Sequence, residues 1–102
     1  MRMFGKMMTS SQRNYLRKQA HSLKPVVTVG KMGLDQRIFS ALDEALNDHE
    51  LVKVRFQDFK EQSKELANEL AESVVAELVT VIGHIAIIYR PSDDKTKQKI
   101  KI

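Results

Sequence analysis

The chain has no cysteine and no tryptophan, and it holds only four glycines and two prolines in 102 residues. Without cysteine it can form neither a disulfide framework nor a thiolate metal site. No apolar run reaches the ~20 residues that a membrane span requires. The first residues, MRMFGKMM, are too short and too interrupted for a secretory signal. These absences favour one cytoplasmic domain with a modest hydrophobic core.

Acidic residues are missing from the first third of the chain. Residues 1–34 contain seven Lys or Arg and no Asp or Glu, and residues 95–102 contain four lysines and no acid. All thirteen acidic residues lie between 35 and 94, beside six basic ones. A surface without a charged partner usually mixes the two signs. The pattern therefore favours an anionic partner that docks on one side, although a basic end without a role remains the alternative.

The hydrophobic pattern predicts the element order α-β-α-β-α-β-β, an α/β fold. Helices are expected over residues 10–22, from about 33 to 49, and after residue 58, with capping boxes at Thr9 with Gln12 and at Asp58 with Glu61. Strands are expected over 25–29, 51–56, 78–82 and 85–89, the last two joined by a type II′ turn at Gly83. The nearly continuous apolar run in 25–29 predicts an interior strand.

Two of the four glycines, Gly30 and Gly33, flank Lys31 and Met32 between the first strand and the second helix. Glycine permits a positive φ and the close approach of another backbone. A helix that begins at about residue 33 would direct its free N–H groups toward this loop, which suits a phosphate. A tight turn that needs glycine only for its geometry explains the same residues. The spacing matches neither the dinucleotide fingerprint nor the P-loop.

Three segments, in the order HSLKPVVTVGKMGL, HELVKVRF and VTVIGHIAIIYRP, resemble the CRM domain in its single-domain bacterial YhbY-like form. The resemblance covers residues 9–91. It leaves residues 1–8 as a flexible leader, in which Met1, Met3, Met7 or Met8 is the start, and residues 92–102 as a flexible basic tail. It implies a compact four-stranded mixed sheet with packed helices, similar to the C-terminal domain of translation initiation factor three.

The resemblance also implies a function. Members of the family look like small RNA-binding proteins associated with the precursor of the large ribosomal subunit. Their GxxG loop is similar to the one with which KH domains clamp nucleic-acid backbone. We therefore expect a monomeric protein that assists ribosome assembly by contacting rRNA backbone. The expected RNA-binding residues are the loop and six further cations: Gly30, Lys31, Met32, Gly33, Arg17, Lys18, Lys24, Lys53, Arg55 and Arg90.

A protein–protein adaptor without direct RNA contact is the alternative function. It would use the sheet and the third helix, whose outer side carries four acidic residues at helical spacing: Glu61, Glu65, Glu69 and Glu72. Salt dependence separates the two functions, because phosphate binding weakens steeply with salt and an apolar protein interface does not.

Neither catalysis nor metal binding is indicated by the sequence. His21, His49 and His84 are far apart and have no cysteine or nearby histidine partner, which does not favour a zinc site. His21 is expected at a helix end, or in contact with RNA, and His84 in a turn. The acids of the third helix have the spacing of a solvated face, and no nucleophile–base pair is apparent. We expect neither an enzyme nor a bound cofactor.

Overall fold

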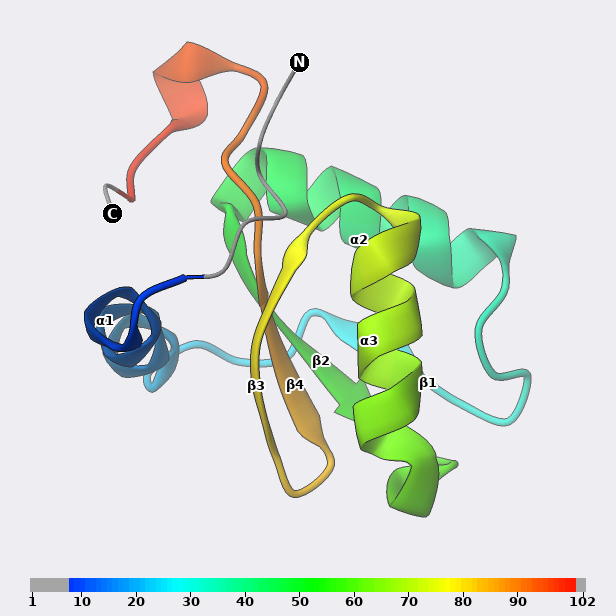
Figure 1. The fold of residues 1–102 in the computed structure, drawn as a ribbon. Coiled ribbons are helices and arrows are strands. Elements are labelled where there is room, and N and C mark those ends of the chain that lie inside the picture. The colour runs from blue at the N-terminus through cyan, green and yellow to red at the C-terminus, as the bar shows by residue number, and fades with distance from the viewer. Residues whose placement is uncertain (1–7, 101–102) are drawn as a thin grey trace.

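The computed structural model describes residues 8–100, in which three α-helices surround one four-stranded sheet (Figure 1). Helix α1, Ser10–Ala20, lies on one face of the sheet, and helices α2, Gln36–His49, and α3, Ser63–Ser73, lie on the other (Figure 1). The strands and the two 3-10 turns are β1, Val27–Val29; β2, Leu51–Phe56; β3, Glu77–Ile82; β4, Ile85–Tyr89; η1, Lys60–Gln62; and η2, Lys95–Lys97. The expected α/β fold and element order are confirmed.

The sheet is mixed and has the strand order β1-β2-β4-β3. β1 runs parallel to β2, whereas β4 is antiparallel to both of its neighbours. The prediction that the first strand lies in the interior is wrong, because β1 is an edge strand. Val27 and Val29 are buried on the face that α2 and α3 cover, but Thr28 between them is exposed on the other face. A valine-rich run thus fits an edge strand that is covered on one side.

Each face of the sheet has its own hydrophobic core. The larger core joins the sheet to α2 and α3 and includes Leu42, Leu46, Val54, Phe56, Leu70 and Ile88. The smaller core joins the other face to α1 and consists of Leu16, Ala20, Leu51, Val79, Ile87 and Tyr89, with Met8 and Ile100 packed against it. Because α1 covers only part of this second face, the rest of the face is open for binding.

The start of α1 and the β3–β4 turn follow the predictions from the sequence. The Thr9 hydroxyl accepts a 3.1 Å hydrogen bond from the Gln12 N–H, and the Gln12 side chain accepts one of 3.0 Å from the Thr9 N–H. This capping box satisfies two amide groups that the helix leaves without a partner. Gly83 has a positive φ of 60°, as a type II′ turn requires at its first central position.

The starts of α2 and α3 differ from the predictions. α2 begins at Gln36, because Asp35 is its N-cap and accepts a 3.2 Å hydrogen bond from the N–H of Ile38. The capping box expected at Asp58 is absent from the described structure. Instead Phe59 takes a left-handed conformation, η1 follows, and α3 starts after Gln62 without a side-chain cap. A change in chain direction therefore precedes α3.

The segment after β4 folds back on the end of α2 (Figure 1). Glu50, the C-cap of α2, is buried, and its carboxylate accepts hydrogen bonds from the backbone N–H groups of Ser92 (2.8 Å), Lys99 (2.7 Å) and Ile100 (3.1 Å). Lys97 also pairs with Asp48 at 2.9 Å. Ser92 and Ile100, which belong to the tail expected to be flexible, are therefore packed against the domain.

The domain boundaries expected from the sequence remain a prediction. Of the expected leader, only Met8 belongs to the described residues, and it packs against the smaller core. Residues 1–7 and 101–102 lie outside the described part of the chain.

Candidate nucleic-acid interface

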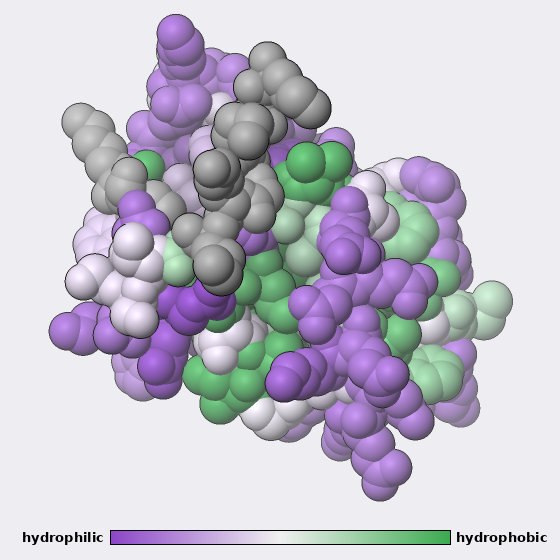
Figure 2. Space-filling view, viewed as in Figure 1, coloured by the Kyte–Doolittle hydropathy of each residue, from purple (hydrophilic) through white to green (hydrophobic). Residues whose placement is uncertain are grey.

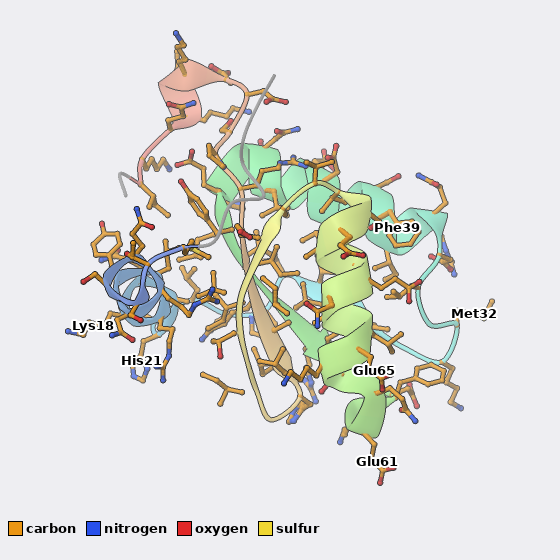
Figure 3. The ribbon with its side chains drawn as sticks, viewed as in Figure 1. Lys18, His21, Met32, Phe39, Glu61 and Glu65 are labelled. Carbon is orange, nitrogen blue, oxygen red and sulfur yellow. The ribbon has the colours of Figure 1, made fainter. Side chains whose placement is uncertain are left out.

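The GxxG loop is a β-turn at the end of β1. The N–H of Gly33 donates a 3.0 Å hydrogen bond to the Gly30 carbonyl, which places Lys31 and Met32 at the centre of the turn. Both side chains are exposed, and Met32 projects away from the fold (Figure 3). Among the hydrogen bonds of residues 8–100, none has the N–H of Lys31 or Met32 as its donor. These two amides are thus available to an acceptor such as a phosphate oxygen.

The two glycines have different structural requirements. Gly33 has a φ of +69°, which other residues rarely adopt, so the turn itself favours glycine; a β-carbon there would make only an ordinary 3.7 Å contact with the Phe59 ring. At Gly30 no positive φ applies, and a β-carbon would meet nothing nearer than the Asp58 carboxylate at 4.0 Å. Turn geometry therefore explains Gly33 and leaves Gly30 unexplained. Close approach of a ligand backbone is consistent with glycine at that position.

The N-terminus of α2, which lies beside the loop, carries the negative charge of its N-cap residue Asp35. The Asp35 carboxylate has its pKa lowered, first by the hydrogen bond from the Ile38 N–H and next by the Arg37 side chain, which lies at 3.2 Å. It is therefore ionised and offsets the positive end of the helix. Asp35 thus satisfies one N–H group of the first turn, that of Ile38, and adds a negative charge where free N–H groups were expected to face the loop. The hollow of about 320 Å³ beside the loop takes its remaining positive charge from Lys31 and Arg37.

A second cationic group lies on α1. A hollow of about 500 Å³ is lined by Arg17, Lys18 and His21 together with Asn14 and Ile82, and none of the described residues around it is acidic. Lys18 and His21 project from the same side of the helix (Figure 3). His21 is the C-cap of α1, as expected of a residue at the helix end. The sequence indicated Arg17 and Lys18 through their spacing, but Ile82 and Asn14 could not be grouped with them without the fold.

Strand β2 connects these two groups. Lys53 donates to the Leu23 carbonyl at 3.0 Å and to the His21 carbonyl at 3.4 Å, so its ammonium group is fixed beside the end of α1. Arg55, two residues on, faces the same side of the sheet and is exposed. Its partner in the register is Thr28, which also lines the loop hollow. The open face of the sheet therefore carries positive charge from α1 toward the loop.

These cations form an extended surface rather than one cluster. Lys18 and Met32 lie on opposite sides of the molecule (Figure 3). We name the surface between them the basic track, made up of Arg17, Lys18, Lys24, Lys53, Arg55 and Lys31. Lys24 is exposed in the segment that leads from α1 into β1. The residues expected to act together thus need a ligand long enough to reach both ends.

Arg90 does not belong to this surface. Its side chain is buried, and the guanidinium donates to the Asp43 carboxylate at 2.8 Å, the Asn47 side chain at 3.1 Å and the Val74 carbonyl at 2.7 Å. It therefore joins β4 to α2 and to the end of α3. The expectation that Arg90 extends an exposed basic surface is wrong, because the arginine has three structural partners.

Two further features of the described chain bear on its chemistry. Within residues 8–100, no helix is both long enough and apolar enough to cross a membrane. The same residues contain no group of three or more His, Cys, Asp or Glu side chains arranged to hold a metal ion.

Comparison with known proteins identifies the family of this chain. The family model described as the CRS1 / YhbY (CRM) domain matches residues 8–90. An "RNA-binding protein" of Haemophilus influenzae is 36% identical over 88 residues, which cover 85% of this chain and 89% of the relative. The "Probable RNA-binding protein YqeI" of Bacillus subtilis is 34% identical over 89 residues, covering 86% and 93% of the two chains.

A solved structure shares the fold. The solution structure of a hypothetical Staphylococcus aureus protein, described there as a candidate RNA binder, has a TM-score of 0.76 and 36% identity. The match covers 93% of this chain and 100% of that one. The chain therefore belongs to the CRS1/YhbY (CRM) domain family, and the family resemblance drawn from its three sequence segments is confirmed.

Proposed function

We propose that this protein binds RNA through the sugar-phosphate backbone, and that its RNA is the rRNA of the large ribosomal subunit precursor, whose assembly it assists. The observation that carries the proposal is the basic track, which joins the GxxG loop to α1 across the open face of the sheet. Family membership and the names of the relatives support it.

The track suits backbone recognition better than base recognition. Its members are Lys and Arg side chains, which neutralise phosphates, and the two outward amides of the GxxG turn, which donate to phosphate oxygens. Its ends lie on opposite sides of the molecule (Figure 3), so a folded RNA with several nearby phosphates contacts more of it than a short single strand does. On this proposal the protein needs neither a cofactor nor a catalytic group, and it acts in the cytoplasm as a monomer.

The acidic side of α3 supports a second candidate, the protein–protein adaptor. Glu61 of η1 and Glu65 of α3 project on a different side from Lys18 (Figure 3), and the surface over α3 is hydrophilic (Figure 2). Glu69 and Glu72 are also exposed. Such a face attracts a basic protein partner. An adaptor of this kind would retain its partner when the cations of the basic track are removed.

Sedimentation of the tagged protein in cell extracts tests the proposal. At low salt it is expected to travel with the large-subunit precursor and to leave it as salt rises. Binding to phosphates releases counterions into solution, and this release favours the complex less as the salt concentration increases. Crosslinking followed by sequencing of the bound RNA is expected to enrich rRNA. A protein that stays at the top of the gradient at every salt concentration contradicts the ribosomal part of the proposal.

A further inference from the structure

A hollow of about 450 Å³ lies between α1, the start of β2 and the C-terminal segment. It is separate from the hollows at the GxxG loop and on the outer side of α1. The side chains around it are Tyr15, Gln19, Leu23, Lys24, Val26, His49, Leu51, Val52, Lys53, Lys99 and Ile100. Its volume falls in the range of about 300–1,000 Å³ that is usual for ligand sites.

The wall of this hollow is apolar and exposed. Tyr15 is 41% exposed, Leu23 39% and Val26 57%, although helical spacing alone would place Tyr15 and Leu23 among the core residues. These three are among the seven large hydrophobic residues that are exposed in the described part of the chain. Apolar side chains that gather in one concave place and are rimmed by polar groups usually mark a binding site.

The rim of the hollow is cationic. Lys24, Lys53 and Lys99 line it along with His49, and none of the described residues that line it is acidic. Lys53 is fixed in place by its bonds to the carbonyls at the end of α1. A purely apolar ligand would make no use of these charges. An aromatic wall with a lysine rim instead complements a ligand that has a flat apolar part and a negative charge.

The C-terminal segment completes the hollow. The backbone N–H groups of Lys99 and Ile100 donate to the Glu50 carboxylate at 2.7 Å and 3.1 Å, and Ile100 packs against the smaller core. Glu50 thus seats the two residues that form one side of the site. The lysine at 99 is held at a defined position, which differs from the freely moving charge expected of a flexible tail.

We propose that this hollow receives one unpaired base of a single-stranded stretch of RNA, which stacks on Tyr15 while its adjoining phosphates lie near Lys24 and Lys99. The proposal rests on the proposed RNA-binding function and adds a second mode of contact to it. Stacking on an aromatic ring tolerates any base, so the site selects unpaired RNA rather than a sequence. From Val26 at the hollow to Gly30 is four residues of extended chain, about 13 Å, so one RNA can reach both sites.

Binding measurements on paired and unpaired RNA test the site. The probes are a fluorescent single-stranded uridine 12-mer and a 12-base-pair RNA duplex, each titrated with the full chain. The variants are Tyr15→Ala, Tyr15→Phe, which keeps the ring, and Val75→Ala, a control at an exposed apolar residue outside the hollow. Tyr15→Ala is expected to weaken binding of the single strand about tenfold. Tyr15→Phe and Val75→Ala should bind as the wild type does, and duplex binding should change less than twofold.

Melting curves check that each variant is folded, which is expected because Tyr15 is half exposed and lies outside both cores. Tyrosine emission gives an independent signal: the chain has no tryptophan, and its only other tyrosine, Tyr89, is buried. The single strand should quench the emission of the wild type and not that of Tyr15→Phe.

The outcomes separate this site from the proposed function. If the wild type binds both RNAs but Tyr15→Ala loses nothing, or loses equally on both, the stacking site is wrong and RNA binding stands. If the wild type binds neither RNA, the stacking site is wrong, and sedimentation with the large-subunit precursor decides the proposed function separately. If Tyr15→Ala removes a protein crosslink and leaves RNA affinity unchanged, a protein side chain occupies the hollow and the nucleotide site is overturned.

Discussion

The carboxylate of Glu50 accepts a 2.8 Å hydrogen bond from the backbone N–H of Ser92, across 42 residues of sequence. Glu50 lies at the end of α2 with a φ of 66°, and Ser92 lies in the segment that follows β4. The same carboxylate binds the N–H groups of Lys99 and Ile100. One buried acid therefore attaches the C-terminal segment to the domain.

Replacing Glu50 with Gln should lower the free energy of unfolding by about 2 kcal/mol. The amide keeps one acceptor oxygen but directs an NH₂ group at N–H donors, and a hydrogen bond to a charged group contributes ~1.5–3 kcal/mol. Urea denaturation measures the change. Asp48→Asn is the matched control, because it removes the carboxylate of an exposed ion pair on the same helix and should have a much smaller effect. Equal stability of Glu50→Gln and wild type would contradict the attachment described above.

Deleting residues 95–102 should lower the melting temperature by several degrees, on the order of 5 °C. The deletion removes the packing of Ile100 and leaves Glu50 without two of its hydrogen-bond donors. A control in which the four lysines of this segment become Gln keeps the backbone contacts and the packing of Ile100. That control should melt close to the wild type and should reduce only the salt dependence of RNA binding. Unchanged melting of the truncated protein would restore the expectation of a flexible tail.

Arg90→Ala should destabilise the fold by roughly 2–3 kcal/mol, because it leaves the Val74 carbonyl and the Asn47 side chain without their charged donor. Where the variant is still folded, the salt dependence of RNA binding should equal that of the wild type. Denaturation and binding curves on the same preparation check both statements. If Arg90→Ala is as stable as the wild type and its RNA affinity depends less on salt, Arg90 contacts RNA and its structural role described here is wrong.

Several elements could be read from the sequence because their determinants are local. The capping box at Thr9 and the turn at Gly83 depend on residues within four positions of each other, and both are present. For α2 the hydrophobic spacing predicts too early a start, because Leu34 fits the helical pattern while the Asp35 cap decides where the helix begins. Likewise, a valine-rich run does not distinguish an edge strand from an interior one, so the sequence does not predict the edge position of β1.

The candidate site was less predictable, since its key features depend on contacts that are distant in sequence. Arg90 looks like any other basic residue until Asp43 and Asn47 of α2 are placed beside it. The buried role of Glu50 needs donors that are more than 40 residues away. Local spacing predicts a cation's position on a helix or strand, but only the fold shows whether that cation is exposed.

Gly30→Asp, compared with Gly30→Ala, tests the loop without the strain that affects Gly33. A β-carbon at Gly30 meets no atom nearer than 4.0 Å, so both variants should fold, whereas Gly33→Ala must adopt a φ of +69° and should lose ~1–2 kcal/mol of stability. The Asp variant places a negative charge where phosphate is expected and should bind RNA at least tenfold more weakly. The Ala variant should lose much less. If a folded Gly30→Asp protein binds RNA with wild-type affinity, the loop is only a turn and does not contact RNA.

The salt dependence of RNA affinity in single-cation variants tests the central claim most directly. The logarithm of the binding constant should fall linearly with the logarithm of the salt concentration. Lys31→Ala and Arg55→Ala should each reduce the magnitude of that slope by about one unit. Lys64→Ala, which removes an exposed lysine of α3 outside the basic track, should leave the slope unchanged. Equal slopes for all three variants and the wild type, or an affinity that does not respond to salt, would contradict phosphate recognition by the basic track.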